Sequence, residues 1–482
     1  MSKEPKVHSI TSGTILTVAM RWSDRMIGLV STLILARLLL PEDFGIIAMA
    51  SLAIGLATVL FDVGVNIALI QNKDATQDHY DSAWTLRLIQ SVIVTLLLVL
   101  ISPWIANYFH DQRVELVVQA LALSILIGGF ENIGIIAFQK HMQFGAEFRF
   151  LFSKRVSGFL VTITLAFLFH SYWALVFGTL VGRIVGVGLS YYMHTMRPKI
   201  STVKIKEIFS VSQWMMLRSI GGYLNNNLHK FVVGRSYSSA AMGGYTLADE
   251  ISAMPTSELL APLNRVLFPA FSEVKNDLAE LKKIFLLAQS LQILVAVPVA
   301  LGLALVAEEA ILILLGDKWS MIIPFVQVLA LIGITQSIGT SSGYILMVLG
   351  KFRASIVNCW FQVILFVGLL YAIPTVNVID IAWLKLASSA LGLGMVFYQL
   401  LRAFPIVTIL DLIRSSIRPL LGALAMSLAL LNFPILIDSI WVLLTLKVLY
   451  GAIVYVAVVM VSWLILGRPE GAESYLLDKV LK

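Results

Sequence analysis

The chain has 482 residues, 59% of them hydrophobic and 13% charged, and its mean hydropathy is +0.89. Soluble globular proteins average about 45–50% apolar and about 25% charged residues, so this composition excludes a soluble protein and indicates an integral membrane protein. The net charge of +7 would also fit a nucleic-acid-binding protein. Most of the basic residues gather in loops between apolar segments, however, so we expect no nucleic-acid partner.

Apolar segments long enough to cross a bilayer as helices follow one another along the chain. The links between them are short, so the sequence predicts an all-α fold of about 14 transmembrane helices without a soluble domain. The long apolar run behind the polar start MSKEPKVHS favours a retained first span over a cleaved signal peptide. The expected spans are 14–35, 44–70, 83–105, 115–139, 150–169, 173–193, 208–233, 242–268, 285–306, 321–349, 355–373, 379–401, 417–433 and 441–466.

Lysine and arginine are distributed unevenly between alternate loops. With the N-terminus inside, the inside segments hold 22 of these residues, whereas the outside loops hold only Arg37, Arg113, Arg235 and Lys318. The positive-inside rule therefore predicts that both termini are cytoplasmic.

Two stretches 198 residues apart resemble each other, Arg37-LLLPED-Phe44-Gly45 and Arg235-SYSSAA-Met242-Gly243. In both, an arginine closes one span, a six-residue link follows, and an apolar–Gly pair opens the next span. Six spans separate the two stretches, so the two halves should share one orientation in the membrane. We expect an N-terminal six-helix lobe at 1–200, a C-terminal six-helix lobe at 201–405, and two additional helices with a cytoplasmic tail at 406–482.

Small residues and prolines mark two of the spans. Gly178, Gly182 and Gly186 recur every four residues, which lets a neighbouring helix approach closely. Pro255, Pro262 and Pro269 recur every seven residues in the span 242–268 and just beyond it, and should kink or break it. The prolines fit either irregular packing or a hinge.

The first span carries charges near its middle. Arg21, Asp24 and Arg25 share one helix face. Each would cost about 2.5–3.5 kcal/mol at the bilayer centre, so we expect them to face the protein interior or a hydrated cavity. Asp24 can pair with one arginine, which leaves one positive charge over.

The first span of the second half is also polar at depth. Its sequence QWMMLRSIGGYLNNNLHKFVVGR places polar and basic side chains on two adjoining helix faces. We therefore expect a hydrated cavity between two lobes. Its basic residues should be Arg21, Arg25, Arg218, Lys230 and Arg265. Its further polar lining should be Asn225, Asn226, His229 and Lys385.

Acidic residues are fewer than basic ones within the expected spans, so the interior should be net positive. A base-dominated cavity favours a phosphate or an acidic sugar over a cationic drug. Asp24, Asp62 and Glu131 are candidates for coupling to H⁺ or Na⁺, and the same charges would also fit ion pairs that only brace helices.

Other kinds of chemistry lack a signal in the sequence. The single cysteine, Cys359, excludes an intramolecular disulfide. The histidines show no HxxxH spacing and no GxxxxGK[ST] loop occurs. We therefore expect no metal, no cofactor and no enzymatic activity.

Several motifs resemble those of a known transporter family. These motifs are RWS followed by ILARLLLPEDFGIIAMA and FDVGVNIALIQ, then YLNNNLHKFVVGR with GGYTLADEISAMP, then LNRVLFPAFSEV and LLGDKWSMIIPFVQVLALIG. In this order they resemble polysaccharide-transporter (Wzx-type) flippases of the multidrug/oligosaccharidyl-lipid/polysaccharide superfamily, closest to the exopolysaccharide (colanic-acid) exporters.

The resemblance implies two six-helix lobes in a V and alternating access. It also implies flipping of undecaprenyl-pyrophosphate-linked repeat units outward across the bacterial inner membrane, with glycosyltransferases and a polysaccharide polymerase as pathway partners. The cationic cavity of the family would map onto the five basic residues given above. Family members often carry an acidic residue where this chain has His229, so a role for an acid there does not transfer.

Three other functions stay open at this stage. A cation-coupled multidrug exporter of the same superfamily would share the fold, and a lipid II flippase would share the type of cargo. A membrane polysaccharide polymerase or ligase would need catalytic residues on large outside loops. The longest outside loop expected here is about ten residues, which disfavours that enzyme.

Overall fold

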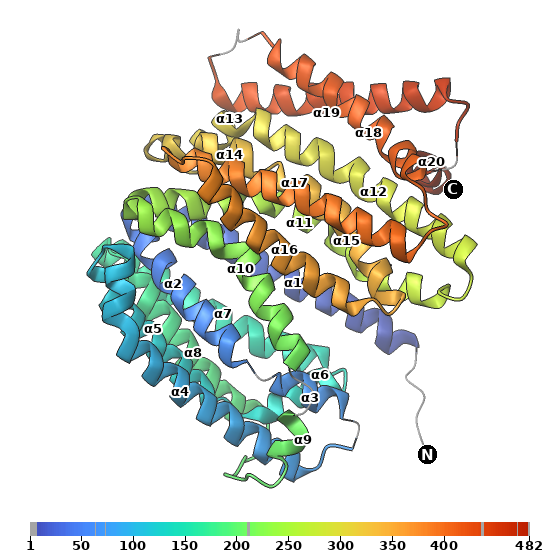
Figure 1. The fold of residues 1–482 in the computed structure, drawn as a ribbon. Helices are drawn as coiled ribbons and strands as arrows, with labels where there is room; N and C mark the ends of the chain where they lie inside the picture. Colours follow the sequence, from blue (N-terminus) through green and yellow to red (C-terminus); the bar gives the residue numbers. More distant parts are fainter. Residues whose placement is uncertain are drawn as a thin grey trace. The chain divides into compact units, whose positions relative to one another are not determined.

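The computed structural model describes residues 7–62, 64–72, 74–209, 213–434, 438–469 and 471–480, and within these ranges it leaves out the side chains of 7–19, 21, 71, 209, 213–215 and 480. All regular secondary structure among the described residues is helical (Figure 1). The expected all-α fold is confirmed.

The helices form two compact units, Met1–Gly243 and Gly244–Lys482. Within the first unit α10 packs along α2, and the lobe bounds expected from the sequence stay a prediction. The first unit contains α1 (Val7–Leu38), α2 (Pro41–Phe61), α3 (Val65–Gln71), α4 (Gln77–Phe109), α5 (Arg113–Gly129), η1 (Ile133–Ile135), α6 (Ile136–Lys140), α7 (Phe144–Phe169), α8 (Trp173–Met193), α9 (Ile205–Phe209), α10 (Gln213–Ser236) and the start of α11 (Ser239–Glu273).

The second unit continues α11, which remains one helix despite its three prolines. Within this unit α12 packs against α15 and α18, and α18 pairs with α19. Its elements after α11 are α12 (Leu278–Leu305), α13 (Ala307–Leu314), η2 (Asp317–Ile322), α14 (Ile323–Leu329), α15 (Ile332–Val348), α16 (Phe352–Ala372), α17 (Val378–Ala403), α18 (Ile409–Leu431), α19 (Ile440–Ile465) and α20 (Ala472–Val480).

Among the described residues, nine helices are long and apolar enough to cross a membrane, or ten if the bent pair formed by α5 and the segment Ile133–Lys140 counts as one span. Each of the fourteen predicted segments falls on one or more helices. The long helices α1, α10, α11 and α18 carry charged residues and are not among the nine. The chain is a multi-pass membrane protein, and the count of fourteen stays a prediction.

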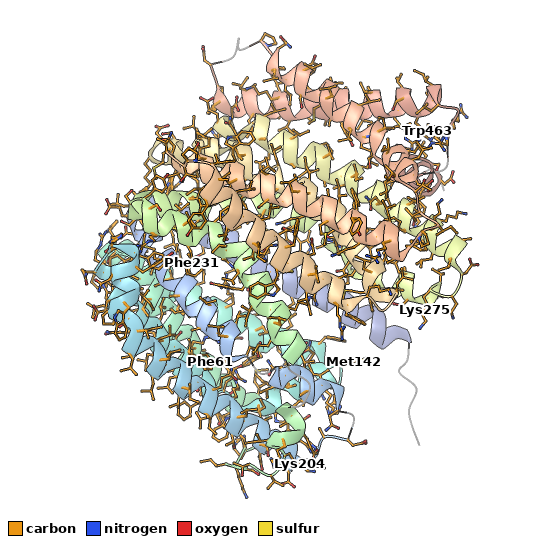
Figure 2. All side chains as sticks on the ribbon, viewed as in Figure 1. Phe61, Met142, Lys204, Phe231, Lys275 and Trp463 are labelled. Carbon is orange, nitrogen blue, oxygen red and sulfur yellow. The ribbon has the colours of Figure 1, made fainter. Side chains whose placement is uncertain are left out.

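Two predicted spans are broken, which corrects the sequence-based bounds. The segment 44–70 divides after Phe61, labelled in Figure 2, because Gly64 adopts a left-handed backbone (φ +67°) and donates its N–H to the Asp62 carboxylate at 2.9 Å. Glycine is the residue best suited to that conformation. The segment 115–139 bends by 72° after Gly129, where the Asn132 side chain accepts from Gly134 N at 2.9 Å. Hydropathy does not register such local turns.

The glycine stripe of α8 lies against α7, as its spacing predicted. A Cβ added at Gly178 would lie 2.9 Å from the backbone oxygen of Gly158, and one added at Gly182 would lie 3.5 Å from the Cα of Gly158. At Gly186 a Cβ would meet the Lys154 side chain at 2.8 Å. The small residues therefore let α7 and α8 come close together, and the Lys154 side chain of α7 lies against Gly186 of α8.

The glycines of the sequence repeat meet each other at the start of α2 and α11. A Cβ at Gly45 would lie 1.8 Å from Ser239 O, and one at Gly243 would lie 2.0 Å from Pro41 O. Close contact with backbone leaves no room for a side chain at either position. The equivalent positions of the repeat thus form a reciprocal crossing within the first unit.

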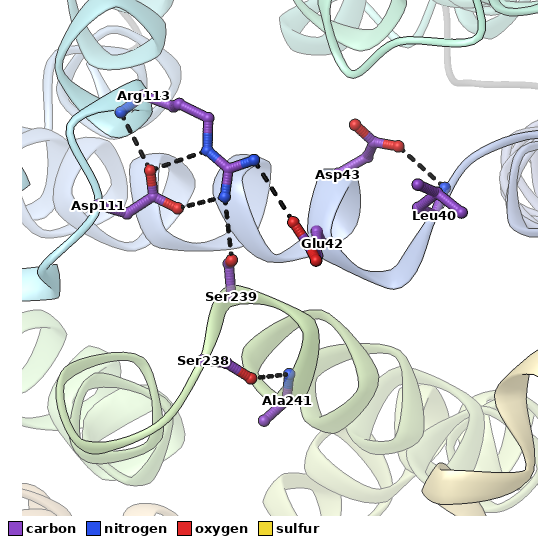
Figure 3. A network of polar contacts seen from close by, with 8 residues as sticks. All are labelled: Leu40, Glu42, Asp43, Asp111, Arg113, Ser238, Ser239 and Ala241. Carbon is purple, nitrogen blue, oxygen red and sulfur yellow. Dashed lines mark hydrogen bonds and ion pairs between the residues drawn. The ribbon is translucent and has the colours of Figure 1, made fainter.

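Arg113 holds this crossing to the α4–α5 connection (Figure 3). Its guanidinium donates to Asp111 at 2.8 and 3.0 Å, to Glu42 at 3.4 Å and to Ser239 at 3.2 Å. Burial acts to raise the pKa of the Asp111 carboxyl, but the hydrogen bonds from Arg113 outweigh it and hold that pKa below its usual value.

The connection between α8 and α9 is fixed to the first turns of α4. Backbone N–H groups of Lys199, Ser201 and Lys204 donate to the side chains of Asp81, Thr85 and Ser82, respectively, at 2.9–3.0 Å. Lys204, labelled in Figure 2, also pairs with Glu207 at 2.6 Å. Hydrogen bonds from Lys204 and then from His79 lower the pKa of Glu207. The residues that follow the sixth predicted span are therefore part of the first unit.

We expect Gly178→Ala to lower the stability of the protein by about 1–3 kcal/mol, the usual cost of overpacking, because the new Cβ would lie 1.7 Å from Thr162 Oγ1. Gly188→Ala, in the same helix, is the matched control, since nothing lies within 4 Å of its added Cβ. Thermal unfolding in detergent measures both variants. Equal unfolding temperatures would show that the α7–α8 contact is not close.

Candidate functional site

A cavity of about 650 Å³ lies inside the first unit. The helices α2, α3, α4, α5 and α8 form its walls, and they pack beside one another in Figure 1. Its lining mixes apolar side chains with polar ones, and the polar and charged lining residues are Ser51, Thr58, Asp62, Asn66, Arg87, Gln90, Ser91, Ser124, Thr179 and Arg183.

Two arginines give the cavity its charge. Arg87 comes from α4 and Arg183 from α8. The Arg183 guanidinium lies beside Gly128 of α5, where an added Cβ would be 3.6 Å from Nη1. Arg183 is also near enough to Arg87 to interact with it electrostatically. Guanidinium groups bind carboxylate and phosphate oxygens through several N–H donors, so this wall is suited to an anion.

A buried carboxylate stands next to Arg87. Glu131 is only 4% exposed and accepts a hydrogen bond from Lys154 Nζ at 2.7 Å. Arg87 Nη2 lies 3.8 Å from the same oxygen. The break between α5 and α6 places Glu131 here, and the narrow α7–α8 contact brings Lys154 to it.

The structure extends α7 beyond its predicted start. The sequence placed Lys154 and Arg155 near the inside end of a span starting at 150, but α7 begins at Phe144. Both residues therefore lie well within the helix. Asp24 forms an ion pair with Arg155 at 3.2 Å, and both side chains are more than half exposed. Arg25 is half-buried on α1, and the side chain of Arg21 lies outside the described residues.

Two of the predicted acidic residues lie at or next to the cavity. Asp62 lines it from the end of α2, while Glu131 lies behind Arg87. Both were proposed as coupling groups on composition alone, and that role stays a prediction.

The predicted polar residues of α10 do not line this cavity. His229 is 1% exposed and its ring Nε2 donates to the Asn226 backbone oxygen at 2.9 Å. Arg218 and Asn226 are exposed, whereas Asn225 and Lys230 are half-buried. Tyr223, which the sequence analysis did not single out, attaches the helix to α2 by donating to Leu52 O at 2.7 Å.

The remaining predicted residues lie in the second unit. Arg265 is exposed on α11, and Lys385 is 6% exposed on α17. A smaller cavity of about 160 Å³ in this unit includes Asp249, Asn264 and Gln336 in its lining but neither of those two residues. The passage expected between the two lobes stays a prediction.

Sequence reasoning missed Arg87, Arg183 and Lys154 as site residues. Arg87 and Arg183 fall within predicted spans and Lys154 falls near the inside end of one, but none of the three was assigned to the cavity. Arg183 follows Gly182 directly in the sequence and therefore lies about 100° around the helix from the glycine stripe, so the stripe does not indicate where its side chain lies.

No metal centre is indicated in the part of the chain that the structure describes, where no group of three or more His, Cys, Asp and Glu side chains is placed to hold an ion.

The fold defines the class of protein, a multi-pass helical membrane protein with the two-bundle fold of known transporters. The lipid II flippase MurJ in an inward closed conformation aligns with a TM-score of 0.72 and 16% identity over 94% of this chain and 99% of that one. An inward-facing multidrug MATE transporter aligns with a TM-score of 0.59 and 15% identity over 80% and 96%.

The sequence profile of the polysaccharide biosynthesis protein family matches residues 34–324, more than half of the chain. The chain belongs to this family, which confirms the predicted resemblance. An uncharacterized membrane protein in the cps region of Klebsiella pneumoniae is 26% identical over 446 residues, 91% of this chain and 92% of that protein. Lipopolysaccharide biosynthesis protein WzxC of Escherichia coli is 27% identical over 345 residues, 71% and 70% of the two chains.

We expect the cavity to be reachable by charged reagents. With Cys359→Ser as background, Thr179→Cys should react with a water-soluble anionic methanethiosulfonate, and faster than with a cationic one, because two arginines share its cavity. Val176→Cys, in the same helix, is the control because Val176 is 0% exposed. Equal reactivity of the two cysteines, or a preference for the cationic reagent, would contradict this description.

Proposed function

We propose that the protein flips lipid-linked oligosaccharide repeat units from the cytoplasmic to the periplasmic leaflet of the bacterial inner membrane. Membership of the polysaccharide biosynthesis protein family supports the pathway. Relatives include WzxC and the teichuronic acid biosynthesis protein TuaB of Bacillus subtilis. The fold shared with a lipid II flippase supports transport across the membrane.

The observation that carries the proposal is the arginine-lined cavity inside helices that cross the membrane. A polar, anionic headgroup cannot pass through hydrocarbon without a large desolvation cost. Arg87 and Arg183, with the hydroxyl and amide groups around them, replace part of its hydration. The lipid tail remains in the bilayer while the headgroup moves through the protein.

The finer features of this proposal come from the sequence. The carrier is undecaprenyl pyrophosphate, both termini are cytoplasmic, and alternating access exposes the headgroup site to each side in turn. Arg21, Arg25, Arg218, Lys230 and Arg265 contribute further positive charge along the path. Glycosyltransferases supply the cargo and a polymerase consumes it, and the flippase itself forms and breaks no covalent bond.

A cation exporter is the nearest rival, since a MATE transporter shares the fold. A site for organic cations would place carboxylates where the substrate binds. The main cavity instead has two arginines and one carboxylate, Asp62, in its lining. This charge favours an anionic cargo.

We expect Arg183→Gln to abolish surface polysaccharide and to cause lipid-linked oligosaccharide to accumulate on the cytoplasmic side, because the variant loses a ligand of the headgroup. Complementation of a deletion strain, with analysis of the extracted lipid-linked oligosaccharides, measures this. Arg149→Gln is the control, since Arg149 is exposed and bonds only to the Gly145 backbone among the contacts seen. Normal export by an Arg183→Gln protein expressed at wild-type level would refute the proposed role of the cavity.

We also propose that H⁺ or Na⁺ drives the cycle through Asp24, Asp62 or Glu131. Flipping in membrane vesicles should stop when ionophores collapse both the H⁺ and the Na⁺ gradient. Without a gradient, the carboxylates bind the ion equally well from either side of the membrane, so ion binding no longer drives the cycle in one direction. Collapsing each gradient alone identifies the ion. An unchanged rate with both gradients collapsed would exclude coupling to either.

A further inference from the structure

The charges around the main cavity are arranged in two layers. Arg87 and Arg183 line the cavity, whereas Glu131 and Lys154 do not appear in its lining and lie behind it. Glu131 contacts Lys154 and Arg87 and is 4% exposed. A carboxylate in this position does not line the cavity, so it acts on a bound group through its charge and through the cations that it holds.

Glu131 holds its two partners unequally. The same oxygen, Oε2, is 2.7 Å from Lys154 Nζ and 3.8 Å from Arg87 Nη2. The first distance is a short, charge-assisted hydrogen bond, and the second is beyond hydrogen-bond range. Lys154 is therefore held by Glu131, while Arg87 keeps its donors available toward the cavity.

The cluster as a whole is positive. Arg87, Arg183 and Lys154 bring three positive charges and Glu131 brings one negative charge, which leaves an excess of two. Arg183 interacts electrostatically with both Arg87 and Lys154. Excess charge of one sign at low dielectric is unfavourable, and an anion that enters from the cavity relieves it.

From this arrangement we infer that Glu131 sets the anion affinity of the cavity. Arg87 and Arg183 are the ligands of an anionic group, bound through its phosphate or carboxylate oxygens, and Glu131 is a positioning residue that fixes Lys154 and partly neutralises Arg87. An arriving anion takes over Arg87 without breaking the Lys154–Glu131 hydrogen bond. When the anion leaves, Glu131 again stabilises Arg87, so release is not opposed by a bare buried charge.

This inference rests on the proposed function and adds a chemical class of ligand and a residue that regulates its release. Two parts of a lipid-linked oligosaccharide carry such oxygens, namely the pyrophosphate link and acidic sugars. Both present oxygens that a guanidinium pair can bind. The probes below separate these two sources.

The test measures binding of inorganic pyrophosphate and of glucuronate to the full chain in nanodiscs of zwitterionic lipid, by isothermal titration calorimetry. Arg183→Gln should weaken binding about tenfold, because one of two ligands is lost. Glu131→Gln should tighten binding about tenfold, because it raises the local charge by one unit. A general structural defect would weaken binding, so a gain in affinity distinguishes the inferred role from a merely structural one.

Two further variants keep the test decisive if Glu131→Gln does not fold. Lys154→Met should weaken binding about tenfold although Lys154 does not line the cavity, because Glu131 is then left to neutralise Arg87. Adding Glu131→Gln to Lys154→Met restores the original net charge and should return the affinity to within about threefold of wild type. Rescue of this kind requires that the charge of Glu131 controls the cavity.

Binding of pyrophosphate alone supports a site for the lipid linkage, and binding of glucuronate alone supports a site for acidic sugars. Wild-type affinity in folded Arg183→Gln protein, or weaker binding in folded Glu131→Gln protein, would overturn the inference. Anion binding with the expected charge series but without any export defect in Arg183→Gln cells would leave the subsite standing and reject the proposed function. Loss of export in Arg183→Gln cells, together with no anion binding by the wild-type protein, would reject the anion subsite and leave the proposed function standing.

Discussion

A carboxylate held between two cations, inside helices that cross the membrane, is the interaction on which the chemistry of the first unit depends. Removing one member of a buried ion pair usually costs about 3–5 kcal/mol, because the other is left charged and desolvated. Glu131, Lys154 and Arg87 must therefore be placed together. The bend after α5 and the narrow crossing of α7 and α8 are the structural means by which this is done.

The glycines of α8 serve this electrostatic requirement as well as packing. Gly178 and Gly182 bring α8 onto Gly158 of α7, and Gly186 leaves the space that the Lys154 stem occupies. With a larger residue at Gly186, the stem would have to move by a few tenths of an ångström or more. A stripe of small residues in a membrane helix usually reads as a dimerisation or packing face. Here it also determines which lysine reaches the buried carboxylate.

Much of the helical framework could be predicted from the sequence, because hydropathy reports the transfer of each segment into hydrocarbon. All fourteen apolar segments carry helix, and the glycine stripe was correctly expected to contact a neighbour. The breaks at Gly64 and Gly129 were not predictable from hydropathy, since they depend on local hydrogen bonds to Asp62 and Asn132. These breaks change which residues of the two segments lie within the membrane-spanning part of a helix.

The site was less predictable than the fold, and Arg25, Arg87 and Glu131 show why. A charged residue in a membrane span indicates that a polar or oppositely charged partner is needed, but that partner comes from another helix. Glu131 pairs with Lys154, 23 positions along the chain, and with Arg87, 44 positions before it. Helix periodicity within one span locates Arg25 on the face of its neighbours Arg21 and Asp24, but it gives no information about which helices meet.

The two cavities differ in charge, and this difference affects what each can bind. The lining of the smaller cavity combines one carboxylate, Asp249, with amides and hydroxyls such as Asn264, Gln336 and Thr340, and among the described lining residues there is no lysine or arginine. The larger cavity has Arg87 and Arg183. The cavity of the first unit is therefore the one better suited to an anion. Since guanidinium groups stay ionised at any physiological pH, these arginines would favour an anion whichever side the cavity opens to. Directionality in the proposed cycle therefore has to come from groups other than these arginines.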